Sequence, residues 1–170
     1  AKGLPSHSFI GFASGIFLTE DEYEDVAQEA PWLATYAISV PGAKESTKHD
    51  PERVLIPTTA SLSKASMTVR WTQNWVFAAN EPPPGQSANA AMVPFAHVLP
   101  DGRLIMGAGL ISTGILNYGD EIMWNYGPKY IRGYAAGMAP ASTAGSGEML
   151  AELAENLHNV QGMGRELFTY

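Results

Sequence analysis

The stretch NAAMVPFAHVLPDGRLIM, residues 89–106, decides the fold class of this chain. Residues 89–98 are strand-like, and Pro94 favours a position at the edge of a sheet because proline has no N–H to donate to a neighbouring strand. Asp101 and Gly102 separate this run from a second apolar run, and an Asp-Gly pair in that position is typical of a β-hairpin. We therefore expect an antiparallel hairpin here.

Short strand patterns surround the hairpin. Residues 9–17 (FIGFASGIF) alternate large and small side chains, and residues 33–40 (LATYAISV) and 54–56 (VLI) are compact apolar runs, so each favours a strand. The aromatic content of residues 121–126 (EIMWNY) suits a strand end. Residues 43–53 are polar and charged, which predicts a solvated loop.

Two helices are expected. Thr19 is followed by three acidic residues, which indicates an N-cap and a helix that runs to about residue 30. Residues 148–158 (EMLAELAENLH) place their large apolar side chains on one helical face, so this helix should pack on the main body. Many short strands with few helices predict a mainly β fold of the α+β class.

The composition limits the functions that are possible. The chain has 170 residues, enough for one domain, and its 10 basic and 17 acidic residues give a formal charge of −7. This charge argues against direct binding of nucleic acid or of an anionic membrane, and it favours a basic partner. The absence of cysteine excludes disulfides, thiolate zinc sites and cysteine nucleophiles. The apolar stretch 104–116 is too short to span a membrane and no secretory signal is visible, so we expect an intracellular protein.

Common catalytic motifs are missing from the sequence. It contains no GxxxxGK[ST], GxGxxG, GxSxG or HExxH pattern. The histidines are scattered without a second ligand at metal-binding spacing, except that His49 adjoins Asp50, so we expect no metal. The acidic run 20–25 is interpreted as a solvated helix face.

Two segments carry the functional information: AANEPPPGQSANAAMV, residues 78–93, and NYGDEIMWNYG, residues 117–127. Together they resemble the two signature stretches of the SET domain family of protein lysine methyltransferases. The first family signature is a strand that ends in an asparagine, followed by a loop and a second asparagine that starts the next strand. Asn80 and Asn89 match these two positions, while Glu81 stands where the family usually has histidine.

The second family signature, GEELxxDYG, is similar to GDEIMWNYG, in which Tyr126 and Gly127 are intact and Asn125 replaces aspartate. The order and separation of the two segments also fit, and the resemblance extends over residues 1–134. The family's GxG turn, expected just ahead of Lys2, is not present in this chain, and neither is the cysteine-rich zinc tail.

The resemblance implies a SET-like fold, with small curved β-sheets, a pseudoknot and a C-terminal helix. It implies a SET-like domain over residues 1–134 without its opening hairpin, a linker at 135–147, and a helical segment at 148–170 packed on the domain. We also expect residues 130–134, the linker and the C-terminal helical segment with Phe168 and Tyr170 to close the substrate channel.

The activity implied is transfer of a methyl group from S-adenosylmethionine to a lysine of a basic protein or peptide, for which a histone tail is one option. A histone substrate would imply a nuclear location. By resemblance, Tyr126 supplies the catalytic hydroxyl with Tyr36 beside it, and Asn80, Phe77 and Tyr126 bind the cofactor. The lysine channel would be lined by Tyr36, Trp124 and Tyr130.

Two other interpretations remain open. A SET-like domain that has lost catalysis would hold a peptide or partner in the same channel, and the missing GxG turn supports this alternative. An unrelated β-rich domain would carry the motifs by chance, with Tyr126 as a core residue at a strand end and Asn80 as a turn residue. The family interpretation requires the Tyr126 segment to pass beside the Asn80 loop.

Overall fold

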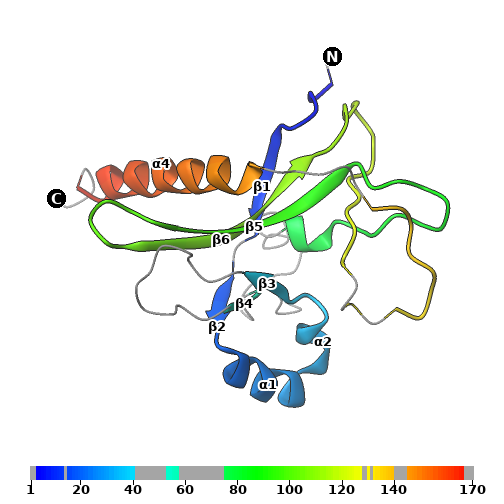
Figure 1. Ribbon diagram of the computed structural model, residues 1–170, viewed down its shortest axis with the longest axis horizontal. Helices are drawn as coiled ribbons and strands as arrows, with labels where there is room; N and C mark the ends of the chain where they lie inside the picture. Colours follow the sequence, from blue (N-terminus) through cyan, green and yellow to red (C-terminus); the bar gives the residue numbers. More distant parts are fainter. Residues whose placement is uncertain are drawn as a thin grey trace.

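The computed structural model describes residues 3–13, 15–40, 53–57, 75–127, 130, 132–139 and 145–166. Within these ranges the strands form two three-stranded antiparallel sheets (Figure 1). The first has the order β1-β6-β5, with β1 at Phe9–Ala13, β6 at Leu104–Ser112 and β5 at Ala90–Val98. The second has the order β2-β4-β3, with β2 at Ile16–Leu18, β4 at Arg53–Ile56 and β3 at Ile38–Val40.

The predicted hairpin is confirmed as β5 and β6. The two strands pair without interruption from Ala90 opposite Ser112 to Val98 opposite Leu104. Gly102 takes a φ of 83° at the turn, a conformation that glycine adopts without strain. β5 lies at the edge of its sheet, as Pro94 predicts.

Residues 9–17 form two strands, not the single one expected. The chain leaves the first sheet after Ala13 and joins the second sheet at Ile16. Gly15 lies at this crossing, where a Cβ atom would come within 1.9 Å of the carbonyl oxygen of Ile56. A residue without a side chain is therefore required at position 15, where the two backbones come close.

The helix after Thr19 is confirmed as α1, Glu20–Glu29, with a complete capping box. The Thr19 hydroxyl accepts from the Glu22 N–H, and the Glu22 carboxylate accepts from the Thr19 N–H at 2.8 Å. The strand expected over residues 33–40 is wrong in its first half, because Leu33 and Ala34 belong to α2, Pro31–Ala34, and residues 35–36 form a turn. Proline at the first helical position favours this short turn, and only β3 is extended.

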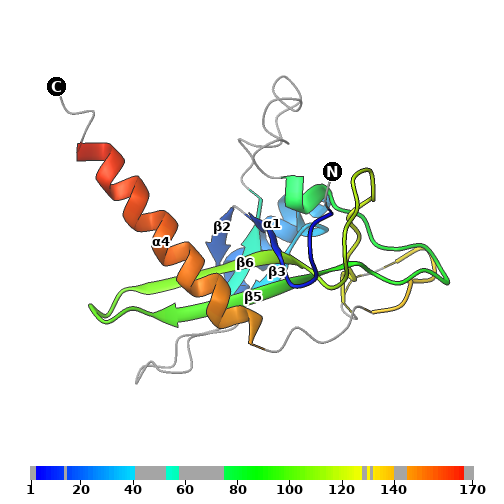
Figure 2. The same cartoon turned by 90° about the horizontal axis from the view of Figure 1, so that it is seen from above.

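The first sheet is covered on both faces (Figures 1 and 2). Helix α4, Ser146–Glu166, lies across one face, where its fully buried Leu150 packs with a cluster that includes Phe95 and Ile111. The opposite face packs on the second sheet and on the short 3-10 helix η3, Trp75–Ala78. Buried residues of this second cluster include Val40, Leu55, Phe77, Ala108 and Leu110.

Two other strands that were expected are not formed. η3 precedes Asn80 where the resemblance implies a strand, and residues 121–126 form isolated bridges at Met123 and Trp124, not a strand. Apart from Arg53, the loop expected at 43–53 lies outside the described residues.

The described elements make an α+β fold built mainly of small antiparallel sheets. No helix among them is both long enough and apolar enough to cross a membrane.

Candidate functional site: an aromatic pocket

The two segments that the sequence singles out lie side by side. The Trp124 N–H donates to the Asn80 carbonyl at 3.0 Å, and Asn80 and Met123 form a parallel bridge. The Ala90 N–H donates to the Met123 carbonyl at 3.0 Å. The segment that leads to Tyr126 therefore passes directly beside the Asn80 loop.

Both motif asparagines hold this neighbouring segment. Asn89 donates from Nδ2 to the Glu121 carbonyl at 2.8 Å, and its Oδ1 accepts from the Met123 N–H at 2.9 Å. Asn80 donates from Nδ2 to the Glu121 carboxylate at 2.8 Å. These bonds join positions more than 30 residues apart in sequence, so the two asparagines fix the register of the 121–124 segment.

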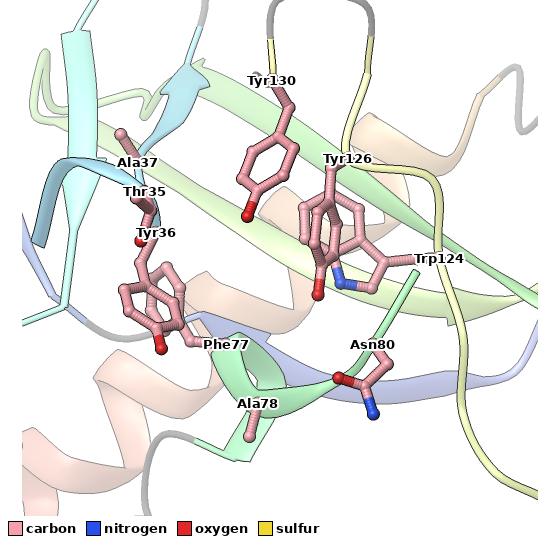
Figure 3. A pocket seen from close by; sticks show the side chains of 9 residues that line it. All are labelled: Thr35, Tyr36, Ala37, Phe77, Ala78, Asn80, Trp124, Tyr126 and Tyr130. Carbon is pink, nitrogen blue, oxygen red and sulfur yellow. The ribbon is translucent and has the colours of Figure 1, made fainter. Parts of the chain in front are cut away.

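A cavity of about 260 Å³ opens where these segments meet (Figure 3). Its volume lies just below the range of about 300–1,000 Å³ for small-molecule sites, so it suits the narrow ends of ligands and not a whole cofactor. All six residues that the resemblance marks line it: Tyr36, Phe77, Asn80, Trp124, Tyr126 and Tyr130. The remaining lining residues are Thr35, Ala37 and Ala78, which carry no charge.

The walls of this aromatic pocket consist largely of rings. Tyr126 packs against Trp124 at 4.9 Å between ring centroids, and it meets Tyr130 edge-on at 4.8 Å and 69°. Tyr36 and Phe77 lie on the opposite side (Figure 3). Aromatic faces attract organic cations, and the apolar rings exclude water.

The Tyr126 hydroxyl is fixed in position. It donates to the Ala79 carbonyl at 2.9 Å, and the Trp124 Nε1–H donates to the same oxygen at 3.2 Å. Burial, with smaller contributions from Tyr134, Tyr130 and Glu81, raises the Tyr126 pKa to about 12. The hydroxyl is therefore neutral near pH 7, where it serves as a hydrogen-bonding group and not as a general base.

Asn80 is exposed and already holds two contacts within the protein. Its carbonyl accepts from Trp124 and its Nδ2 donates to Glu121, so these two groups are committed to the fold. The side-chain oxygen points toward the Ala78 side of the pocket (Figure 3). This oxygen is the Asn80 atom that is best placed to meet a ligand.

Glu81 and Arg132 form a buried ion pair behind the pocket, which the sequence interpretation did not include. The Arg132 Nε donates to Glu81 Oε2 at 2.6 Å, and the side chains are 13% and 0% exposed, respectively. The sequence gives one indication of this pair. Glu81 is the only charged residue in 78–93, and it stands where the SET domain signature usually has histidine. Its partner is 51 residues away, so local sequence gives no sign of it.

The segments that were expected to close the channel lie in different places, and Phe168 and Tyr170 lie outside the described residues. Tyr130 lines the pocket, but the described part of α4 packs with the cluster on the other face of the first sheet. Gly137 and Met138 of the expected linker bond to the Pro82 and Gln86 carbonyls, so they pack along the 82–88 loop. Within the described residues, no group of three histidine, aspartate or glutamate side chains has the spacing of a metal site.

Comparison of the chain with protein-family models, with curated proteins and with solved structures finds no match.

Proposed function

We propose that this chain is a SET-like domain that transfers a methyl group from S-adenosylmethionine to a lysine of a basic protein. The observation that carries the proposal is the meeting of two distant segments around one aromatic pocket, lined by Tyr36, Phe77, Asn80, Trp124, Tyr126 and Tyr130. A pseudoknot at this crossing and the small curved sheets of the family belong to the same proposal.

The residues of the pocket fit the reacting end of this cofactor. Phe77 and Tyr126 offer apolar ring surface for a sulfonium group and its methyl, and Asn80 offers an amide oxygen at the edge. When bound, S-adenosylmethionine supplies an activated methyl group. A cavity of about 260 Å³ suits this end together with the tip of a lysine chain, and the rest of the cofactor would extend along the exposed Asn80 side.

The side chains of the pocket would favour the reactive form of the lysine. An uncharged wall that excludes water lowers the pKa of an entering amine, so the neutral nucleophile becomes more abundant. Tyr126 and Trp124 present ring faces to the positive charge that the amine gains as it is alkylated. Rings held at fixed angles keep the amine in line for attack, and this positioning is the main catalytic contribution.

The charge of the chain supports a basic substrate. The formal charge is −7, and the exposed Glu121 carboxylate lies beside the pocket through its bond to Asn80. Such a field increases the rate of encounter with cationic peptides. Histone tails and other lysine-rich segments both fit this description.

Transfer of a labelled methyl group from S-adenosylmethionine to a panel of lysine-rich peptides tests the proposal. The wild-type protein should label at least one peptide. Tyr126→Phe should lower the rate by about a hundredfold to a thousandfold, the range for loss of one positioned hydrogen-bonding group, because the Tyr126 hydroxyl donates its proton to Ala79 and keeps its oxygen as an acceptor for the lysine amine. Tyr118→Phe is the matched control, because Tyr118 is 97% exposed and outside the pocket. Equal rates for wild type and Tyr126→Phe would contradict the assigned role.

A second candidate is a module that binds lysine or methylated lysine without catalysis. The observation in its favour is the Tyr126 hydroxyl, whose proton is already donated to Ala79. Aromatic cages of this kind bind alkylammonium groups by cation–π attraction. Tight binding of a methyl-lysine peptide, with no binding of S-adenosylmethionine, would select this candidate.

A further inference from the structure

The Glu81 carboxylate is saturated with hydrogen bonds behind the aromatic pocket. Arg132 donates to it from Nε and Nη2, both at 2.6 Å, and the Tyr126 N–H donates to Oε1 at 2.9 Å. A buried carboxylate needs this degree of pairing, because removing one partner leaves a desolvated charge without compensation.

Arg132 also contacts the backbone and the ring of residues beside the pocket. Its Nη2 donates to the Gly127 carbonyl at 2.7 Å, and Nη1 donates to the Tyr130 carbonyl at 2.9 Å. The guanidinium also lies over the Tyr130 ring, 5.3 Å from the centroid. One side chain therefore binds the carbonyls of Gly127 and Tyr130 and faces the ring that lines the pocket.

Tyr126 is held at both ends by the segment that contains Glu81. Its N–H is bound by the Glu81 carboxylate and its hydroxyl by the Ala79 carbonyl. Neither Glu81 nor Arg132 lines the cavity, so the pair touches the two ring-bearing residues without reaching a ligand. The Tyr126 and Tyr130 rings, whose planes lie at 69°, therefore each belong to a residue that contacts one member of the ion pair.

We propose that the Glu81–Arg132 pair fixes the spacing of the Tyr126 and Tyr130 rings and thereby sets the size of the ammonium group that the pocket accepts. Both are positioning residues. This inference rests on the proposed function because it takes the pocket as the site that receives a lysine amine.

The test compares binding of two ions, n-butylammonium and n-butyltrimethylammonium, which represent the end of a lysine before and after full methylation. The wild-type protein should discriminate between them. Glu81→Gln, which keeps an acceptor for the Tyr126 N–H, and Arg132→Lys, which keeps the charge, should each change the ratio of the two dissociation constants by about fivefold, or about 1 kcal/mol.

The exposed Asp101–Arg103 pair in the β5–β6 turn provides matched controls. Its side chains are 52% and 54% exposed, and neither lines the pocket, so Asp101→Asn and Arg103→Lys should leave the ratio unchanged. Carbon-13 NMR of labelled tyrosine rings gives a second measurement. The Tyr126 and Tyr130 signals should shift or broaden in the Glu81 and Arg132 variants, while that of Tyr118 stays unchanged.

An unaltered ratio with unaltered Tyr126 and Tyr130 signals in a folded Glu81→Gln or Arg132→Lys variant would overturn the inference. Failure of the wild-type protein to bind either ion would overturn it as well. The experiment uses neither S-adenosylmethionine nor methyl transfer, so its outcome is independent of the test of catalysis.

Discussion

The pKa of Tyr126 is raised by the surroundings of its side chain. Burial raises its pKa to about 12, whereas a tyrosine in the unfolded chain titrates near about 10. Because the folded-state pKa is the higher one, this tyrosine contributes stability that is fully present below pH about 10 and is lost as the pH rises toward 12.

We therefore predict a late-titrating tyrosine in wild-type protein that is missing in Tyr126→Phe. Ultraviolet titration of tyrosinate absorbance at 295 nm should show the difference between the two proteins concentrated above pH about 11. A Tyr126→Phe difference centred near pH 10 would contradict the burial argument.

The Glu81 carboxylate makes the stability of the protein depend on pH in the opposite direction. The hydrogen bonds from Arg132, with that from the Tyr126 N–H, hold the Glu81 pKa below its ordinary value despite burial. The stability gained is present above the unfolded pKa of about 4.3 and is lost as the pH falls through the lower folded value. Arg132→Met should lower the free energy of unfolding at pH 7 by about 3–5 kcal/mol.

Urea unfolding of wild type and Arg132→Met at a series of pH values measures this effect. The difference between the two proteins should shrink below pH about 4, where Glu81 becomes protonated on unfolding. Arg103→Met should have little effect, since the pair that it removes is exposed to solvent. A difference that is constant from pH 7 to pH 3 would show that the Glu81 charge is not involved.

At the scale of elements, the crossing between the two sheets depends on Gly15. A Cβ there would meet the Ile56 backbone oxygen at 1.9 Å, and backbone cannot move aside as a flexible side chain does. We predict that Gly15→Ala lowers the midpoint of urea unfolding strongly, whereas Gly114→Ala, with no atom within 4 Å of the added Cβ, has little effect. Equal midpoints for the two variants would contradict the close crossing.

Helix α4 should contribute to stability but not to the pocket. Leu150 is fully buried against the sheet face opposite the second sheet, so Leu150→Ala should cost about 2–5 kcal/mol. The described part of α4 does not line the pocket. The folded variant should therefore bind S-adenosylmethionine with the same affinity as the wild-type protein. Calorimetry at a temperature where the variant is folded checks this, and a large loss of affinity would show that α4 acts on the site.

The sequence indicates the elements that local signals define. The Asp101-Gly102 hairpin and the Thr19 capping box lie where they were predicted, since each depends on residues a few positions apart. The helical turn at α2 was missed because periodicity does not separate a short apolar strand from a short helix. The break at Gly15 was missed because the close approach of the Ile56 backbone depends on a contact that is distant in sequence.

For the molecule as a whole, the resemblance marks residues that prove to line one cavity, from Tyr36 to Tyr130. It does not reveal the Glu81–Arg132 pair, because a contact across 51 residues exists only once the chain has folded. The single unusual charge in the first motif was the one trace of this pair that the sequence held.

Isothermal titration calorimetry with S-adenosylmethionine and with S-adenosylhomocysteine tests the central claim most directly. The account predicts that both bind with one site per chain, that Asn80→Ala weakens binding about tenfold or more, and that Asn117→Ala, a turn residue outside the pocket, does not. Glu121→Ala removes the side-chain partner of Asn80, so a smaller loss in this variant separates ligand contact from local support. Absence of binding in every form would contradict the proposed cofactor site.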